Sequence, residues 1–443
     1  MTLDTGKCPR WLFERMVKLG REMTRVLIEE YGPDEYIRRL SDPAWFQSLG
    51  TVLAFDWNAS GLTTILTAAL KEAMRGRERE FGVVICGGKG KTSRKTPDEI
   101  KQWGHHLSLP ASHTENLIYN SRMSAKVDSA LVQDGFQIYH HSFFFSLPKK
   151  GTCPHTYIAQ YSVAAGPHRD AITINRRICS RCGHEEGKPQ RNISVGGWTV
   201  VQQGMNQEEQ TARRYHWHSA HIKDLVCEPH AAISSEVTIE RMLNLIAESS
   251  SDTRGRSTEL VQSGYKPLIK EINLIRKHTS ELSRMVSVES GGEQLTLLKL
   301  EDREFHYHPV VHEDFSKSRY LEKILARLTE NKPKNYEKLV GMEGVGPKTV
   351  RALALVAEVI YGAKPSYEDP ARYSFAHGGK DATPYPVDRR TYDTTISMLE
   401  RAVQRTRISP FEKSKAIRRL VGSRSSLSLI RVRDPDPYEA VME

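Results

Sequence analysis

Carboxylate, histidine and lysine side chains in the amino-terminal half are the first candidates for chemistry. Carboxylates bind divalent cations, and a bound magnesium or manganese ion assists hydrolysis of a phosphodiester bond. Lysine or histidine beside such an ion stabilises the charge that develops on the phosphate. For each acid alone, a helix cap or a surface ion pair is the simpler interpretation, so the prediction depends on their clustering. The predicted catalytic residues in this half are Asp56, Asp128, Asp134, His140 and Lys89.

A second feature is the glycine-rich run from Gly341 to Thr349. Glycines permit the positive φ values of a tight turn, and Pro347 suits the first turn of a following helix. Free amides at such a helix start suit a phosphate oxygen, and a lysine adds positive charge beside them. The alternative is an ordinary helical turn with a glycine cap. The predicted contacts with a nucleic-acid backbone are Gly344, Gly346, Lys348 and Thr349.

Two further stretches combine cations with glycines or aromatics. The run from Gly87 to Lys95 is glycine-rich and basic, but Ile85 stands where a P-loop needs glycine, so no nucleotide cofactor is expected. The run from Arg213 to His218 mixes arginine with tyrosine and tryptophan, which suits base stacking. The alternatives are a solvated turn for the first stretch and buried core for the second. The predicted nucleic-acid contacts are Lys91, Arg94, Arg214 and Trp217.

The pair Cys179 and Cys182 forms a Cys-x-x-Cys knuckle, which supplies two of the four ligands of a structural zinc ion. Cys153 with His155 would complete the set. Cys227 with His230 is the alternative pair, and His184 is a further candidate. A turn with two free thiols is the interpretation without zinc.

Composition favours a polyanionic partner. Lysine and arginine outnumber aspartate and glutamate by 64 to 54, which gives a net charge of +10. The chain has no apolar run of membrane-spanning length, and residues 1–9 lack an apolar signal core, so we expect no membrane association and a cytoplasmic location. Six cysteines with one close pair indicate reduced thiols rather than a disulfide framework.

The elements that would position these residues follow from hydrophobic periodicity. A strand over Thr51–Trp57, a helix over Gly61–Met74 and a strand over Gly82–Cys86 predict an α/β layer. A further strand over Phe136–Ser146 holds the adjacent His140 and His141, which must face opposite sides, so at most one of them shares a pocket with the aspartates. Helices are predicted over Pro9–Glu30, Asn120–Gln133, Ile239–Ala247, Leu268–Met285 and Tyr320–Thr329, and a linker over Glu248–Glu259.

At 443 residues the chain is long enough for two or three domains. The predicted fold is a mixed α/β amino-terminal domain with a candidate zinc-knuckle insertion, followed by an all-helical carboxyl-terminal domain that contains a helix-hairpin-helix. The segments are an α/β domain with a basic glycine loop (1–150), a β-rich continuation with the knuckle (151–232), a helical linker region (233–318), a helix-hairpin-helix domain (319–420) and a disordered tail (421–443).

Several stretches together resemble an uncharacterised prokaryotic family known as domain of unknown function 763. They span most of the chain and include Pro9-Arg-Trp-Leu-Phe, Phe55-Asp-Trp57, Gly87-Gly-Lys-Gly-Lys, Tyr139-His-His141, Val201-Gln-Gln-Gly-Met and Arg214-Tyr-His-Trp217. The sequence departs from the family pattern at Asn58, where the family tends to carry histidine, and in its Cys179 knuckle. The resemblance implies no mechanism.

The run from Leu339 to Val350 resembles the helix-hairpin-helix of DNA repair proteins, which favours DNA over RNA as the partner. In repair glycosylases that motif precedes a Val-Asp pair whose aspartate stabilises the sugar cation; the match here is Val387-Asp388, at longer spacing. Asp388 is therefore a candidate catalytic residue. We predict a DNA repair or processing enzyme, with a metal-dependent nuclease as the first choice. The alternatives are a glycosylase or lyase that uses Asp388 and a non-catalytic DNA-binding module.

Overall fold

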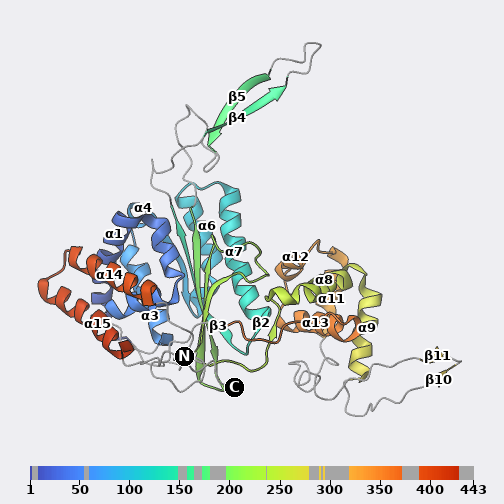
Figure 1. Ribbon diagram of the computed structural model, residues 1–443. Helices are drawn as coiled ribbons and strands as arrows, with labels where there is room; N and C mark the ends of the chain where they lie inside the picture. Colours follow the sequence, from blue (N-terminus) through green and yellow to red (C-terminus); the bar gives the residue numbers. More distant parts are fainter. Residues whose placement is uncertain are drawn as a thin grey trace, which may run out of the picture.

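The computed structural model describes residues 1, 8–53, 59–147, 157–163, 172–179, 196–235, 237–278, 289–290, 293–294, 319–371 and 389–428. The described chain combines an antiparallel sheet, flanked by helices, with a helical part that lies to the right in Figure 1. This mixed architecture, with a helical carboxyl-terminal part, agrees with the general fold class that the sequence predicted. None of the described helices is both long and apolar enough to cross a lipid bilayer.

The central sheet has five antiparallel strands in the order β1-β3-β6-β7-β8. Their side chains alternate between two covered faces, so the strands are apolar or buried on both sides. The sequence prediction placed β1 and β3 correctly. The strands are β1 (Val83–Lys89), β3 (Gln137–Ser146), β6 (Trp198–Asn206), β7 (Thr211–His218) and β8 (His230–Ser234).

One face of the sheet, which we call the α3 face, packs against α1 (Arg10–Leu40), α2 (Pro43–Val52) and α3 (Ala59–Met74). Helix α1 is two helical segments joined at Gly32, whose φ of 82° breaks the helix before Pro33 begins the second segment. The short helix α4 (Glu78–Phe81) then leads into β1.

The opposite face, the α7 face, is covered by α7 (Ala111–Ala130), while α5 (Lys91–Arg94) and α6 (Thr96–His106) flank β1. Val84, Cys86 and Phe143 point to this side, whereas Val83, Ile85 and Phe144 point to the α3 face. The two hydrophobic cores are therefore separated by the thickness of one sheet.

A bundle of five helices packs beside α7 (Figure 1). Helix α13 contacts α8 along its length, and α12 and α13 both reach α7. The bundle consists of α8 (Ser251–Gln262), α9 (Tyr265–His278), α11 (Arg319–Asn331), α12 (Tyr336–Gly341) and α13 (Pro347–Tyr361). Residues 251–259, which belong to the predicted linker over 248–259, thus lie in a packed helix.

The last two described helices belong to the other side of the molecule. Helices α14 (Arg389–Arg405) and α15 (Pro410–Ser428) pack on α1 and α2, with Ile396 and Leu399 in the core of the α3 face. The predicted segment 319–420 is therefore divided between the bundle and the α3 face. Short strand pairs complete the described chain: β2 (Val132–Gln133) with β9 (Leu243–Asn244), β4 (Tyr157–Val163) with β5 (Ile172–Cys179), and β10 (Glu289–Ser290) with β11 (Glu293–Gln294), while η1 (Glu248–Ser250) precedes α8.

Two predicted elements are wrong. The strand predicted over Thr51–Trp57 is contradicted at its start, because residues 51 and 52 end helix α2, which Asp42 caps by accepting from Ala44 N (2.8 Å); residues 54–57 lie outside the described chain. The sheet consequently starts at β1, and it is antiparallel rather than a strand–helix–strand layer. The helix predicted over 239–247 is instead an extended segment that contains β9, where consecutive side chains from 242 to 246 are all buried.

Candidate functional site

A row of polar side chains crosses the α3 face of the sheet from edge to edge. Strand register pairs each member with the next, so all five point to the same side. The other four side chains are buried, including the one on the edge strand β8, whereas Lys89 on the opposite edge strand, β1, is exposed. We call this set the polar row; its members are Lys89, His140, Gln203, Arg214 and Ser234.

Tyr139 joins the polar row because β3 is irregular at this point. The register between β3 and β6 shifts between Ile138 and His140, so Tyr139 lies in a bulge. Gln203 Nε2 donates to the Tyr139 hydroxyl and also to Ser60 O (3.0 Å) at the start of α3. Two consecutive residues, Tyr139 and His140, therefore reach the same face, which a regular strand does not allow.

His140 is a buried neutral imidazole. Thr67 Oγ1 donates to backbone carbonyls of α3, including Thr63 O (2.9 Å), so it accepts from His140 Nε2 at 3.2 Å. His140 Nδ1 then carries the lone pair and has no hydrogen-bond partner among the described atoms. Burial, with smaller contributions from His141 and Lys89, lowers the pKa of His140 to about 3.

Arg214 lies in the middle of the core rather than on the surface. It is 0% exposed, its guanidinium donates to Thr63 Oγ1 (3.1 Å) and lies 4.8 Å above the ring of Phe46, and burial lowers its pKa to about 9. Trp217 is equally buried on the opposite face. The prediction that Arg214 and Trp217 stack on bases is contradicted, because β7 is an inner strand and both side chains are fully buried.

Asp128 is the centre of a separate network on the α7 face. Its Oδ1 accepts from His230 Nε2 (2.5 Å), and its Oδ2 accepts from Gln202 Nε2 (2.5 Å) and Trp217 Nε1 (3.0 Å). His141 extends the network, since its Nδ1 donates to Gln202 Oε1 (2.9 Å). His141, not His140, therefore shares an environment with this aspartate.

Asp134 is also fully engaged and buried. Its Oδ1 accepts from Phe136 N (3.0 Å), and its Oδ2 accepts from Arg213 Nη1 (3.1 Å) and the Tyr215 hydroxyl (2.6 Å). Arg213 also forms two hydrogen bonds to Asp369, which follows α13, so this cluster joins the sheet to the end of the bundle. Burial raises the pKa of Asp134 to about 6.

These contacts contradict the predicted metal-dependent centre at Asp128 and Asp134. Every carboxylate oxygen of both residues accepts a hydrogen bond from a buried protein donor, so the two side chains belong to separate structural networks rather than to one cluster with His140 and Lys89. Among the residues that the structure describes, no group of three histidine, cysteine or acidic side chains is arranged to hold a metal ion. The two aspartates instead connect α7 and its following loop to β7 and β8.

The basic glycine loop continues directly from the polar row. Gly87 and Gly90 have φ values of 89° and 62°, and a Cβ on Gly87 would lie 2.2 Å from His141 O, so glycine is required there. Gly90 N donates to Tyr139 O (2.7 Å), which ties the loop to the bulge. Four cations, Lys89, Lys91, Arg94 and Lys95, are exposed, and no ion pair holds them within the described chain.

The α12–α13 turn is the predicted glycine-rich reversal. Asn335 caps α12 through Lys338 N (2.9 Å), Gly344 has a φ of 86°, and α13 begins at Pro347 after Gly346. No side chain caps the amino terminus of α13. Lys348 is exposed at this helix start, whereas the Thr349 side chain is buried (3% exposed), so Thr349 can contribute only its backbone amide to the predicted contact.

Helix α7 fixes the position of this turn. Lys126 Nζ donates to Val340 O (2.8 Å) and Met342 O, and Gln133 Nε2 donates to Pro347 O (3.2 Å). The turn is therefore attached to the α7 side of the sheet, and the basic glycine loop extends from the sheet edge formed by β1.

Comparison with known proteins gives one match. A family described as "Protein of unknown function (DUF763)" matches residues 1–153 and 193–387, which is most of the chain. The chain belongs to the DUF763 family. No curated protein and no solved structure matches it.

The DUF763 match includes the polar row, the basic glycine loop and the α12–α13 turn, but omits residues 154–192. That gap contains Cys179 and Cys182, in keeping with the predicted departure from the family pattern. Several predicted site residues lie outside the described chain: Asp56, Asp388, Cys153, His155, Cys182 and His184. The zinc knuckle and the Asp388 chemistry therefore stay predictions, while His230 of the alternative zinc pair binds Asp128.

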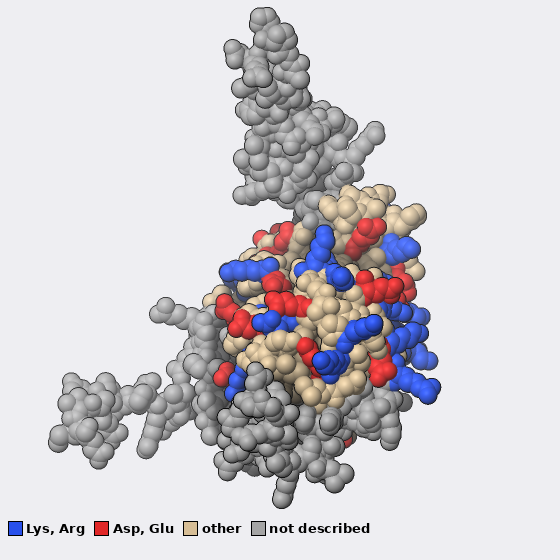
Figure 2. All heavy atoms as spheres, turned by 90° about the vertical axis from the view of Figure 1, so that its right-hand side faces the viewer, with Lys and Arg blue, Asp and Glu red and all other residues tan. Residues whose placement is uncertain are grey.

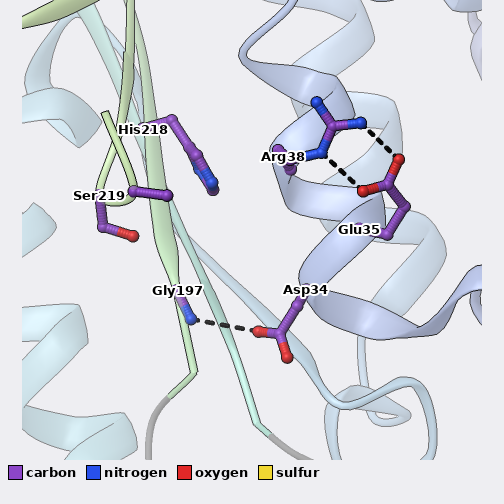
Figure 3. Close-up of a pocket in the computed structure, with 7 residues that line it drawn as sticks. Asp34, Glu35, Arg38, Gly197, His218 and Ser219 are labelled. Atoms are coloured by element: carbon purple, nitrogen blue, oxygen red, sulfur yellow. Dashed lines mark hydrogen bonds and ion pairs between the residues drawn. The ribbon is translucent and has the colours of Figure 1, made fainter. Parts of the chain in front are cut away.

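A hollow of about 330 Å³ lies apart from the polar row, between the carboxyl-terminal part of α1 and the adjoining ends of β6 and β7 (Figure 3). Asp34 Oδ1 accepts from Gly197 N (3.1 Å), Arg38 donates twice to Glu35, and burial lowers the pKa of His218 to about 4. Of the stretches singled out from the sequence, the Arg213–His218 run contributes its last residue, His218, to this hollow.

The sequence patterns did not indicate a role for Tyr139 or Gln203, or the contact between His141 and Gln202. One signal was available for the glutamines: two adjacent amides in a strand place one polar group on each face. The bulge at Tyr139 had no signal, because its position is defined by pairing with a strand about sixty residues later.

Proposed function

We propose that this protein binds the sugar-phosphate backbone of DNA through the α12–α13 turn, which we interpret as a helix-hairpin-helix, and processes the bound strand beside the polar row. The observation that carries the proposal is that uncapped backbone amides and an exposed lysine occur together at the start of α13. The helix has 15 residues and no side-chain cap, and the exposed Lys348 lies in its first turn.

This arrangement favours an anion for two reasons. The first amides of a helix have no partner within the helix, and the helix dipole adds partial positive charge at the same end. Gly346 leaves the backbone open at the surface, since a Cβ there would meet nothing within 4 Å, whereas Gly344 supplies the positive φ of the turn and packs against Ile324. A phosphate oxygen matches these donors, and such a contact positions DNA without reading its bases.

The basic glycine loop supports a second phosphate contact. Its exposed lysines and arginine have no ion-pair partner in the described chain, so a phosphate neutralises them without breaking an existing bond. Figure 2, which views the molecule from the side of the helical bundle, shows basic side chains gathered along one edge and mixed charges over the rest. A strand held by this loop would lie next to Lys89 and Tyr139.

Phosphodiester processing at this edge is favoured by the types of residue that meet there. Lys89 supplies an exposed positive charge, its Nζ lies 5.7 Å from the centroid of the Tyr139 ring, and Tyr139 is itself partly exposed. No group of three metal-ligating side chains is present among the described residues, so the proposal assigns the reaction to Lys89 and Tyr139. The proposed reaction class is cleavage of the DNA backbone on the α3 face, not at Asp128 and Asp134.

Incubation of the purified chain with labelled duplex, single-stranded and lesion-bearing DNA tests this proposal. We expect retarded complexes and cut strands, and we expect Lys89→Ala to cut at least about tenfold more slowly, because it removes a charge that stabilises the transition state. Lys101→Ala, at an exposed position on α6, is the matched control and should cut normally. Parallel reactions with magnesium, manganese and EDTA define the metal requirement. Binding without any cut strand would reduce the protein to a DNA-binding module, and abasic product would indicate a glycosylase.

A further inference from the structure

The geometry of the bulge points to a specific nucleophile, and we propose that Tyr139 attacks the DNA phosphorus to form a covalent phosphotyrosyl intermediate. The inference rests on the proposed function and specifies its chemistry. In a regular strand the side chain of Tyr139 would point away from His140 and its neighbours. The register shift at Tyr139 instead places its hydroxyl against Gln203, on the face that carries the polar row. Bulges are concentrated next to active sites because they redirect side chains in this way.

The hydrogen bond from Gln203 prepares the phenol oxygen for attack. Gln203 Nε2 donates both to that oxygen and to Ser60 O (3.0 Å), so the amide cannot rotate to present its own oxygen to the phenol. A donor fixed in this orientation stabilises negative charge on the oxygen as the phenol loses its proton. Gln203 is 0% exposed and its row neighbour Arg214 is a buried cation, so the charge develops in a region of low dielectric constant. Gln203 thus acts as a positioning residue.

Lys89 and the basic glycine loop supply the other half of the site. Lys89 is exposed and lies over the Tyr139 ring, and Tyr139 O holds the loop through Gly90 N (2.7 Å). Lys91 and Arg94 follow on the same short, exposed segment. A phosphate bound by these cations would approach Tyr139 from the side on which this residue is partly exposed. The described members of the polar row include no carboxylate that would repel it.

The reaction is a transesterification that needs no oxidant, reductant or nucleotide. The phenol oxygen forms a bond to phosphorus while the bond from phosphorus to one deoxyribose oxygen breaks. The leaving oxygen takes a proton from the Lys89 ammonium, and Lys89 is protonated again by the proton that the phenol releases to water. The products are a phosphotyrosyl link and a free deoxyribose hydroxyl. Water completes a nuclease cycle by attacking the link, and a DNA hydroxyl reverses the step.

A nicked duplex that carries a label on each side of the scissile position tests the assignment, because the short cut strand dissociates and the intermediate accumulates. We expect labelled DNA to migrate with the denatured protein, and mass spectrometry to place the nucleotide on the peptide that contains Tyr139. We expect Tyr139→Phe to abolish this adduct and to reduce the rate of cleavage by roughly a thousandfold or more. The affinity of the variant for DNA and its free energy of unfolding in urea should stay within about twofold of the wild-type values. Tyr31→Phe, at a half-buried position on α1, is the matched control and should form the adduct normally.

The outcomes separate this inference from the function on which it rests. Cut strands without labelled protein, equal cutting by Tyr139→Phe, or binding without an adduct would each overturn the role of Tyr139. The first two would leave backbone cleavage intact. Absence of both binding and cutting would overturn the proposed function together with the inference.

Discussion

Replacement of Asp128 by alanine is expected to lower the free energy of unfolding by about 3–5 kcal/mol, a large part of the stability of a typical domain. The carboxylate accepts from three buried donors, on Gln202, Trp217 and His230. Alanine leaves all three without an acceptor in a region where water does not reach, and each unsatisfied buried group is costly. Asp128 connects α7 to three strands, so the loss acts on the whole sheet.

Urea denaturation of the variant measures this effect, with Glu209→Ala in the exposed turn between β6 and β7 as the control. The control should change the free energy of unfolding by less than about 0.5 kcal/mol. A stability for Asp128→Ala as high as that of the control would contradict the network. It would instead fit the original prediction of a metal ligand, whose removal relieves a cluster of negative charge.

The second large effect is loss of stability in mild acid. Burial lowers the pKa of His140 to about 3 and that of His141 to about 4, far below the value of about 6.5 expected in the unfolded chain. The unfolded state then binds more protons than the folded state between these values, so stability is complete above pH 6.5 and falls as the pH is lowered through that window. Each histidine therefore lowers the free energy of unfolding by about 2 kcal/mol at pH 5 relative to pH 7.

Asp134 acts in the opposite direction. Its pKa is raised to about 6 in the folded state, so its protonation there adds about 1 kcal/mol of stability between pH 7 and pH 5. The net expectation from these three groups is a decrease of about 3 kcal/mol. Urea titrations at pH 7, 6 and 5 measure it, and His105→Gln on the exposed face of α6 should leave the pH dependence unchanged. A free energy of unfolding that is constant over this range would show that His140 and His141 are not buried as neutral groups.

Local signals were sufficient for the parts of the site that local sequence determines. The turn glycines, Pro347 and the apolar spacing on either side correctly predicted α12 and α13, because a cap, a positive φ and a helix start each depend on a few neighbouring residues. The same holds for β1 and the glycines that follow it. The opposite orientation of His140 and His141 was also predicted, since it follows from the two-residue period of a strand.

The composition of each buried network could not be predicted, because it depends on strand order and register. Arg214 resembles a surface cation in sequence, yet its position on an inner strand places it over Phe46. In sequence, Asp128 is equally compatible with an ordinary helix residue and with a metal ligand. Only the pairing of β3, β6, β7 and β8 brings Gln202 and His230 to it. Pairings between residues this far apart leave no pattern within a local window.

The central claim is that the start of α13 holds a DNA phosphate, and the salt dependence of duplex binding by Lys348→Glu tests it most directly. Lys18→Glu, at an exposed position on α1, is the matched control because it makes the same change in net charge. The account predicts that Lys348→Glu weakens binding about tenfold or more and lowers the slope of log affinity against log salt concentration by about 1, whereas Lys18→Glu changes neither. Equal affinities and equal slopes for the two variants would contradict it.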